Sequence, residues 1–222
     1  MYRAKIYINF KIGVTLYFGA VRKCAKEIFY LKKFLLACGT LVSLAILRCE
    51  TCVLIKKLRM KMEKVLVSAC LLGSPVRYDG IASNFKDETL THWLGQGRLV
   101  SICPEVAGGL PVPRPRAEII NGNGSLVLKG RTGVIDVNGQ NVTNYFLAGA
   151  HKALELARFH DIKLAVFKEG SPSCGTGYIH DGSFSGIKKP GKGVAAALLE
   201  KNGIRVFSER KISEAKEFLK RL

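Results

Sequence analysis

The sequence predicts an α/β fold, a Rossmann-like and mostly parallel sheet with flanking helices and an inserted β-hairpin. Short apolar runs alternate with helical patterns between residues 63 and 222. The run at 163–168 is continuously apolar, as in a strand that is covered on both faces. An Asn-Gly-Asn-Gly sequence at 121–124 stands between two short apolar runs and is typical of a hairpin turn.

The core strands are predicted where short apolar runs precede loops: 64–69, 99–102, 163–168 and 204–207. Helices are predicted where apolar residues recur at helical spacing: 86–94, with Trp93 packed inward, 143–159, 194–200 and 212–222. Asn141 or Thr143 can cap the helix that runs to about Phe159. Gly203 is suited to end the helix predicted at 194–200.

The inserted hairpin is expected to pair residues 117–120 with residues 125–128, and a further short strand is expected at 133–137. Prolines and glycines crowd residues 104–117, and glycines, serines and prolines crowd residues 170–192. Both segments are therefore predicted to be loops.

The formal net charge of +18 is divided unevenly along the chain. Residues 1–62 hold 13 Lys and Arg against 2 Asp and Glu, whereas residues 63–222 hold 22 against 15. We therefore expect a basic, partly apolar N-terminal extension at 1–62 and an α/β domain at 63–222. The mild charge of that domain suits an anionic or polar small substrate as well as RNA, so charge alone does not favour nucleic-acid binding.

The N-terminal extension contains an uncharged run of 14 residues at 34–47. A membrane span needs about 20 apolar residues, so no stable span is expected. Met60 and Met62 stand just before the first predicted strand, and one interpretation is that translation starts at one of them. A membrane-associating segment and a folded subdomain are the alternatives.

The seven cysteines are an odd number and follow no convincing secretory signal. This pattern argues against a disulfide framework and favours a reducing, cytoplasmic setting. Cys49 and Cys52 form a CxxC pair, but a second pair at zinc-binding spacing is missing from the sequence.

Three cysteines each follow a predicted strand directly, in a loop rich in Gly, Pro or Ser. They are Cys70 in SACLLG, Cys103 in ICPE and Cys174 in SPSCG. The carboxyl ends of parallel strands meet at one rim of an α/β sheet, where ligands bind. Three thiols at that rim can hold a metal or cluster and leave one coordination position empty. The spacing leaves zinc, an iron–sulfur cluster and buried structural thiols all open.

The motifs SACLLG, VRYDG, ICPEVAGGLPVPRPRAE and FKEGSPSCG resemble the thiouracil desulfurase family over about residues 63–208. The resemblance implies a 4Fe–4S cluster held only by Cys70, Cys103 and Cys174, with the fourth iron open. It also implies that a thiolated base such as 2-thiouracil becomes the oxo base with release of sulfide. The catalytic Glu and Ser of the family fall on Glu105 and Ser171.

The positions of Glu105 and Ser171 agree with such chemistry. Replacing sulfur by oxygen is hydrolytic and needs proton transfer. Glu105 stands two residues after Cys103, so a tight Cys-Pro-Glu turn can bring its carboxylate beside the thiols, and Ser171 stands three residues before Cys174. The alternatives are a solvated loop carboxylate and a serine that only shapes the turn.

We therefore expect a cytoplasmic iron–sulfur enzyme that acts on a small thiolated base or nucleoside, with thio-modified tRNA as a less favoured substrate. The alternative is a non-catalytic, Cys-ligated zinc protein that binds a nucleotide or RNA. Other residues with a possible place at the rim are Arg77, Tyr78, Asp79, Lys168 and Glu169. Surface or capping roles are expected for His92, His151, His160 and His180.

Overall fold

A computed structural model of the chain describes residues 62–83 and 85–222. The predictions for the uncharged run at 34–47 and for the Cys49–Cys52 pair lie outside these residues. The central sheet has four parallel strands in the order β2-β1-β5-β8. They are β1 (Val65–Ser68), β2 (Leu99–Ile102), β5 (Leu164–Phe167) and β8 (Arg205–Ser208).

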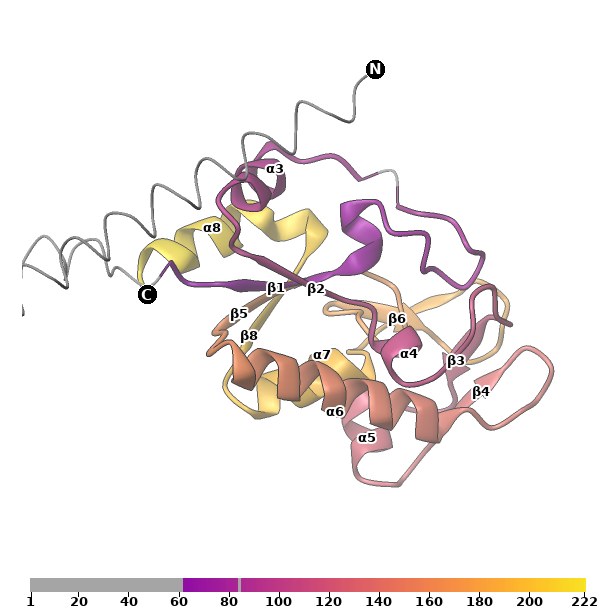
Figure 1. The fold of residues 1–222 in the computed structure, drawn as a ribbon. Coiled ribbons are helices and arrows are strands. Elements are labelled where there is room, and N and C mark those ends of the chain that lie inside the picture. The colour runs from indigo at the N-terminus through magenta and orange to yellow at the C-terminus, as the bar shows by residue number, and fades with distance from the viewer. Residues whose placement is uncertain (1–61, 84) are drawn as a thin grey trace, which may run out of the picture. The chain divides into compact units, whose positions relative to one another are not determined.

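Helices cover both faces of this sheet, with α6 and α7 on one face and α3 and α8 on the other (Figure 1). Their bounds are α3 (Glu88–Gly95), α6 (Thr143–Phe159), α7 (Val194–Lys201) and α8 (Ile212–Lys220). The predicted α/β class with a mostly parallel sheet is thereby confirmed.

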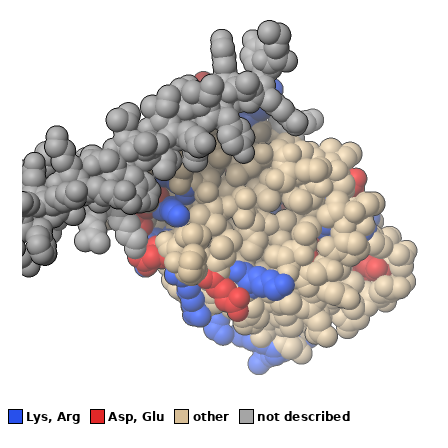
Figure 2. Space-filling view, viewed as in Figure 1, with Lys and Arg blue, Asp and Glu red and all other residues tan. Residues whose placement is uncertain are grey.

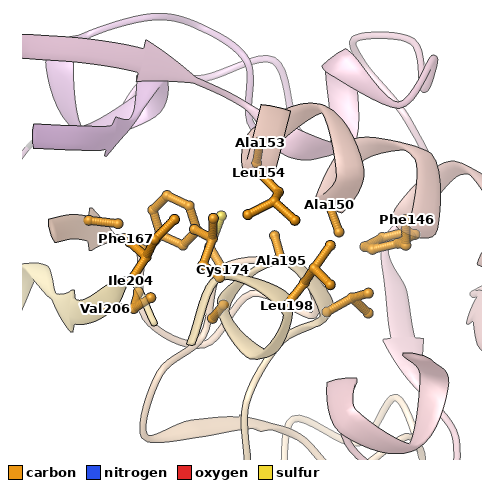
Figure 3. Packing of buried hydrophobic residues seen from close by; sticks show 14 of the residues in the cluster. Phe146, Ala150, Ala153, Leu154, Phe167, Cys174, Ala195, Leu198, Ile204 and Val206 are labelled. Atoms are coloured by element: carbon orange, nitrogen blue, oxygen red, sulfur yellow. The ribbon is translucent and has the colours of Figure 1, made fainter. Parts of the chain in front are cut away.

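The strand side chains alternate between two apolar layers. Leu66 packs toward α6 and α7, whereas Val65 and Val67 pack with Trp93 in the layer toward α3 and α8. Because β1 is buried on both faces, its sequence is apolar without alternation. Figure 3 shows the α6–α7 layer, in which Cys174 lies among the apolar side chains.

The inserted antiparallel pair is present, but the prediction of its second strand at 125–128 is wrong. Strand β3 (Ala117–Ile119) pairs with β4 (Val134–Asp136), and residues 124–128 form the short helix α5 (Gly124–Leu128). The side chain of Asn123 accepts a hydrogen bond from the Leu126 N–H at 3.2 Å. The turn sequence therefore starts a helix, because Asn is as good an N-cap as it is a turn residue.

The two segments predicted as loops contain regular structure. A single helical turn, α4 (Pro104–Ala107), follows Cys103, and Pro at its first position suits a helix start. Residues 170–192 contain the antiparallel strands β6 (Tyr178–His180) and β7 (Lys188–Pro190). A 3₁₀ turn, η2 (Ala69–Leu72), holds Cys70, and a second, η3 (Glu209–Lys211), precedes α8.

Helix α4 is held against α6 by direct backbone contact. A Cβ atom on Gly149 would lie 1.9 Å from the Pro104 carbonyl oxygen, and one on Gly108 would lie 2.0 Å from the Tyr145 carbonyl oxygen. Only glycine permits this approach. It fixes the backbone that carries Cys103 and Glu105.

Within residues 62–83 and 85–222, none of the helices has the length and apolar content needed to cross a membrane. On the face shown in Figure 2, Lys and Arg side chains lie beside Asp and Glu side chains, and other residues fill most of the described surface in view. This mixed face agrees with the mild net charge of residues 63–222.

Candidate functional site

A pocket of about 500 Å³ opens at the carboxyl ends of β1, β2 and β5. The chain leaves β1 for β2 on one side of the sheet and later returns to place β5 on the other side. Ligands of open α/β sheets bind at such a switch point. Cys70, Cys103 and Cys174 all line this pocket.

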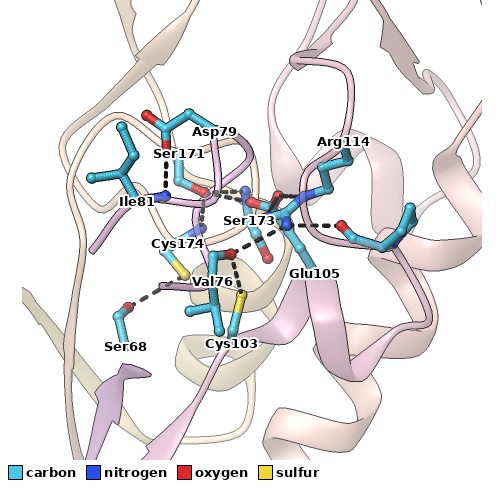
Figure 4. Close-up of polar contacts among 11 residues, drawn as sticks. Ser68, Val76, Asp79, Ile81, Cys103, Glu105, Arg114, Ser171, Ser173 and Cys174 are labelled. Carbon is cyan, nitrogen blue, oxygen red and sulfur yellow. Dashed lines mark hydrogen bonds and ion pairs between the residues drawn. The ribbon is translucent and has the colours of Figure 1, made fainter. Parts of the chain in front are cut away.

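Each cysteine is fixed by its local backbone (Figure 4 shows Cys103 and Cys174). Cys70 lies in η2, and its carbonyl oxygen accepts the N–H of Ser83 at 3.1 Å. The Cys103 thiol lies 3.7 Å from the Val76 carbonyl oxygen. Cys174 is 5 % exposed, and its sulfur accepts a hydrogen bond from the Ser68 hydroxyl at 3.5 Å. All three thiols are free of disulfides.

The surroundings disfavour ionisation of these thiols. Burial, followed by the charge of Cys103, raises the pKa of Cys70 to about 11, although Lys168 and Arg77 oppose the shift. Burial also raises the pKa of Cys103, and it raises the pKa of Cys174 well above the ordinary value despite the Ser68 hydrogen bond. Three thiolates in this pocket would therefore require a compensating positive centre, such as a bound metal ion or cluster.

Among the described residues, no three His, Cys, Asp or Glu side chains converge closely enough to hold a single metal ion. The three thiols instead border one pocket from three different strand ends. An iron–sulfur cluster takes each cysteine thiolate at a separate iron, so its ligands lie around a cavity. The donor set and its placement fit such a cluster.

Glu105 lines the same pocket and pairs with Arg114 (Figure 4). Its Oε2 atom accepts hydrogen bonds from Nε and a terminal nitrogen of Arg114 at 2.9 and 2.7 Å. The Arg114 side chain is 4 % exposed and also donates to the carbonyl oxygens of Val76 and Pro111. The guanidinium therefore fixes the carboxylate firmly in place.

Ser171 connects this carboxylate to the Cys174 loop. Its hydroxyl donates to Glu105 Oε1 at 3.1 Å, and its oxygen accepts the N–H groups of Ser173 and Cys174 at 3.0 and 3.1 Å. Both oxygens of Glu105 are thus held, one by Arg114 and one by Ser171. The arrangement couples the position of the carboxylate to that of the Cys174 backbone.

The amino end of α7 supports the Cys174 loop from behind. The N–H of Val194 donates to the Pro172 carbonyl oxygen at 2.9 Å, and the N–H of Ala195 donates to that of Ser173 at 3.0 Å. A Cβ atom on Gly193 would lie 2.4 Å from the Ser173 carbonyl group. The loop therefore rests on the helix without room for a side chain.

Glu169 fastens the far side of the same loop. Burial disfavours its ionised form, but hydrogen bonds from the Thr176 hydroxyl and from the N–H groups of Tyr178, Gly177 and Thr176 outweigh burial and hold the pKa of Glu169 below its ordinary value. Its contribution to stability is therefore fully present above the ordinary carboxyl pKa of about 4.3 and is lost as the pH falls through the lowered native pKa.

We predict that Glu169→Gln lowers the free energy of unfolding by about 2 kcal/mol at neutral pH, because hydrogen bonds to a charged group are lost. The difference from the native protein shrinks as the pH falls through the lowered pKa of Glu169, where the native carboxylate also becomes protonated. Denaturant unfolding over a series of acidic and neutral pH values measures the effect. Glu217→Gln is the matched control: Glu217 is exposed and pairs with Lys220, so its loss costs little. Equal effects of the two substitutions would contradict the role of Glu169.

The structure brings the five predicted site residues, Cys70, Cys103, Cys174, Glu105 and Ser171, to one pocket. The further rim candidates Arg77, Tyr78, Lys168 and Glu169 line it too, whereas Asp79 pairs with Arg77 at 3.0 Å. Glu118 forms an ion pair with Arg116 at 3.9 Å, whereas Arg114 turns to Glu105.

Sequence reasoning did not assign Arg114 to Glu105 or give Ser68, Tyr178, Lys188 and Arg210 any place in the site, yet all of them line the pocket. Strand β6 could not be recognised within a segment rich in Gly and Ser. His180, expected in a surface or capping role, lines the pocket as well.

Comparison with known proteins gives consistent results. The family model described as 2-thiouracil desulfurase matches residues 65–211. An uncharacterized protein of Bacillus subtilis strain 168, YbbK, is 41 % identical over 150 residues, which are 68 % of this chain and 98 % of YbbK.

The solved structure of a protein named [4Fe-4S]-dependent thiouracil desulfidase TudS is 44 % identical to this chain, with a TM-score of 0.66. The similarity covers 72 % of this chain and 99 % of that chain.

Proposed function

Because this chain belongs to the 2-thiouracil desulfurase family, we propose that it exchanges the sulfur of a thiolated pyrimidine for oxygen from water and releases sulfide. The observation that carries this proposal is the shared pocket of three strand-end thiols and the Glu105–Ser171 pair. TudS, a similar protein of known structure, is named as a [4Fe-4S]-dependent enzyme.

Cys70, Cys103 and Cys174 are the residues that would hold the cluster, with the fourth iron free of a protein ligand. When bound, the cluster supplies an open, Lewis-acidic iron that prefers soft sulfur to oxygen. The pocket thiols are free, and thiolate sulfur is a ligand suited to iron–sulfur clusters.

Glu105 is proposed to receive a proton from the attacking water. Overall, one water and one thiocarbonyl group become a carbonyl group and hydrogen sulfide, and nothing is oxidised or reduced. Arg114 holds Oε2 and fixes the carboxylate in place, while Oε1 exchanges a proton through Ser171. Ser171 thus positions the base and takes part in proton relay.

The size of the pocket favours a small substrate. Sites for small molecules measure about 300–1,000 Å³, and the volume of about 500 Å³ found here is within that range. A free base or nucleoside is therefore proposed before a thio-modified tRNA.

The proposal is tested by anaerobic purification, cluster reconstitution and incubation with 2-thiouracil, 4-thiouracil, their nucleosides and thiolated tRNA. We expect a brown protein that converts at least one small thiolated base or nucleoside to its oxo form with one equivalent of sulfide. A colourless protein that carries stoichiometric zinc and releases no sulfide would instead support a non-catalytic metal protein.

A further inference from the structure

Glu118 is a buried acid that the proposed mechanism does not use. It lies on β3 and is 1 % exposed. Its Oε2 atom accepts the N–H groups of Gly182 and Phe184, both at 3.1 Å. Its Oε1 atom has no hydrogen-bond partner within the described part of the chain. A buried carboxylate oxygen without a hydrogen-bond partner lowers the stability of the folded protein.

The ring of His180 faces this oxygen. Its Nδ1 atom lies 4.0 Å from Glu118 Oε1 and is likewise buried without a hydrogen-bond partner among the described residues. The His180 side chain is 26 % exposed and lines the catalytic pocket. Since Nδ1 is buried, the accessible part of the ring lies on its other side, toward Nε2.

Two cations lie near this pair. Arg116 Nε lies 3.9 Å from Glu118 Oε1, and Lys188 stands opposite His180 in the β6–β7 ladder. A carboxylate can only accept a hydrogen bond, so the single proton of the neutral ring belongs on Nδ1 and the lone pair on Nε2.

We propose that His180, with its ring orientation and tautomer set by Glu118, accepts a hydrogen bond from a ring N–H of the substrate at Nε2. This inference rests on the proposed desulfurase function and adds a specificity-determining residue to it. The 4.0 Å separation shortens when substrate fills the pocket, as polar contacts of empty sites commonly do.

The chemical consequence is selection for bases that retain a ring N–H. 2-Thiouracil carries an N–H on each side of its thiocarbonyl carbon. A methyl group on the nitrogen that faces His180 removes the donor and leaves Nε2 without a partner inside the pocket. Sites that hydrogen-bond a substrate group discriminate strongly against analogues that lack it.

The test compares 2-thiouracil with its 1-methyl and 3-methyl derivatives in the cluster-loaded protein. We expect kcat/KM to fall at least about tenfold for one derivative in the wild type. His180→Leu should raise the KM for 2-thiouracil and bring that ratio close to one. His180→Gln should restore part of the discrimination, because its amide oxygen can accept the same hydrogen bond.

His92→Gln is the matched control. His92 lies on α3, where it is hydrogen-bonded to Gln96, and it does not line the catalytic pocket. Its substitution should leave the kcat/KM ratio unchanged. Iron content should be the same in all variants. A ratio that is unchanged in His180→Leu, or the same loss in His180→Gln as in His180→Leu, would overturn the role of His180.

Failure of the proposed desulfurase function gives a different result from failure of the His180 inference. If the iron-loaded wild type converts none of the thiolated bases, that function is overturned. Calorimetric binding of uracil and its two N-methyl derivatives then still measures the contact. Equal affinities of the wild type for all three bases would overturn the His180 inference, and weaker binding of one methyl derivative, abolished in His180→Leu, would support it.

Discussion

Replacing Cys174 with serine is expected to remove both iron binding and thiouracil turnover. Serine has nearly the volume of cysteine, so the buried position beside Ser68 remains filled. A hydroxyl group, however, is a hard and weakly acidic ligand that does not replace a thiolate on iron. We expect iron content after anaerobic reconstitution to fall to a small fraction of the wild-type value and turnover to fall to background.

The same loss is expected for Cys70→Ser and Cys103→Ser, because each thiol enters the pocket from a different strand end. Cys52→Ser provides the thiol-matched control, since Cys52 precedes the residues matched by the family model. Iron analysis, visible absorption and thermal unfolding are measured together. A folded Cys174→Ser protein with full iron content and activity would show that this cysteine is not a ligand.

Replacing Glu105 with glutamine is expected to keep the iron and lose the reaction. The side chain has the same shape, but the amide is not a base under the conditions of the reaction. Loss of a general base typically lowers turnover by about 10²- to 10⁴-fold. The expected result is a brown protein with normal iron content and kcat reduced in this range.

This substitution also leaves the buried Arg114 without its counter-charge, so some loss of stability is expected with it. Turnover is therefore measured on the fraction that is folded and iron-loaded. Ser171→Ala is the companion variant, which removes the contact to Oε1 but leaves the charge pair intact. A smaller loss of kcat is expected there. Full activity of Glu105→Gln would exclude the proposed role as base.

The features that sequence reasoning predicted correctly are those with a local signature. Continuous apolar runs marked β1 and β5, and helical spacing marked α6 through Phe159. The position of a cysteine after each of three strands was sufficient to predict a common rim, because parallel strands share one end.

Features that depend on distant parts of the chain were not predictable in the same way. Arg114 meets Glu105 only because the proline-rich loop turns back over α4, and its choice of partner depends on tertiary packing. Asn123 starts α5 where a hairpin was expected, since the same residue serves turns and helix starts. His180 reaches the pocket because β6 pairs with β7 beside it.

Anomalous diffraction at the iron edge, from anaerobically grown crystals of the reconstituted protein, shows directly whether the three cysteines hold a cluster. We expect iron within the pocket, with Cys70, Cys103 and Cys174 each bound to a separate iron and a further iron that has no protein ligand. A pocket without iron, or a single metal ion bound elsewhere, would contradict this expectation.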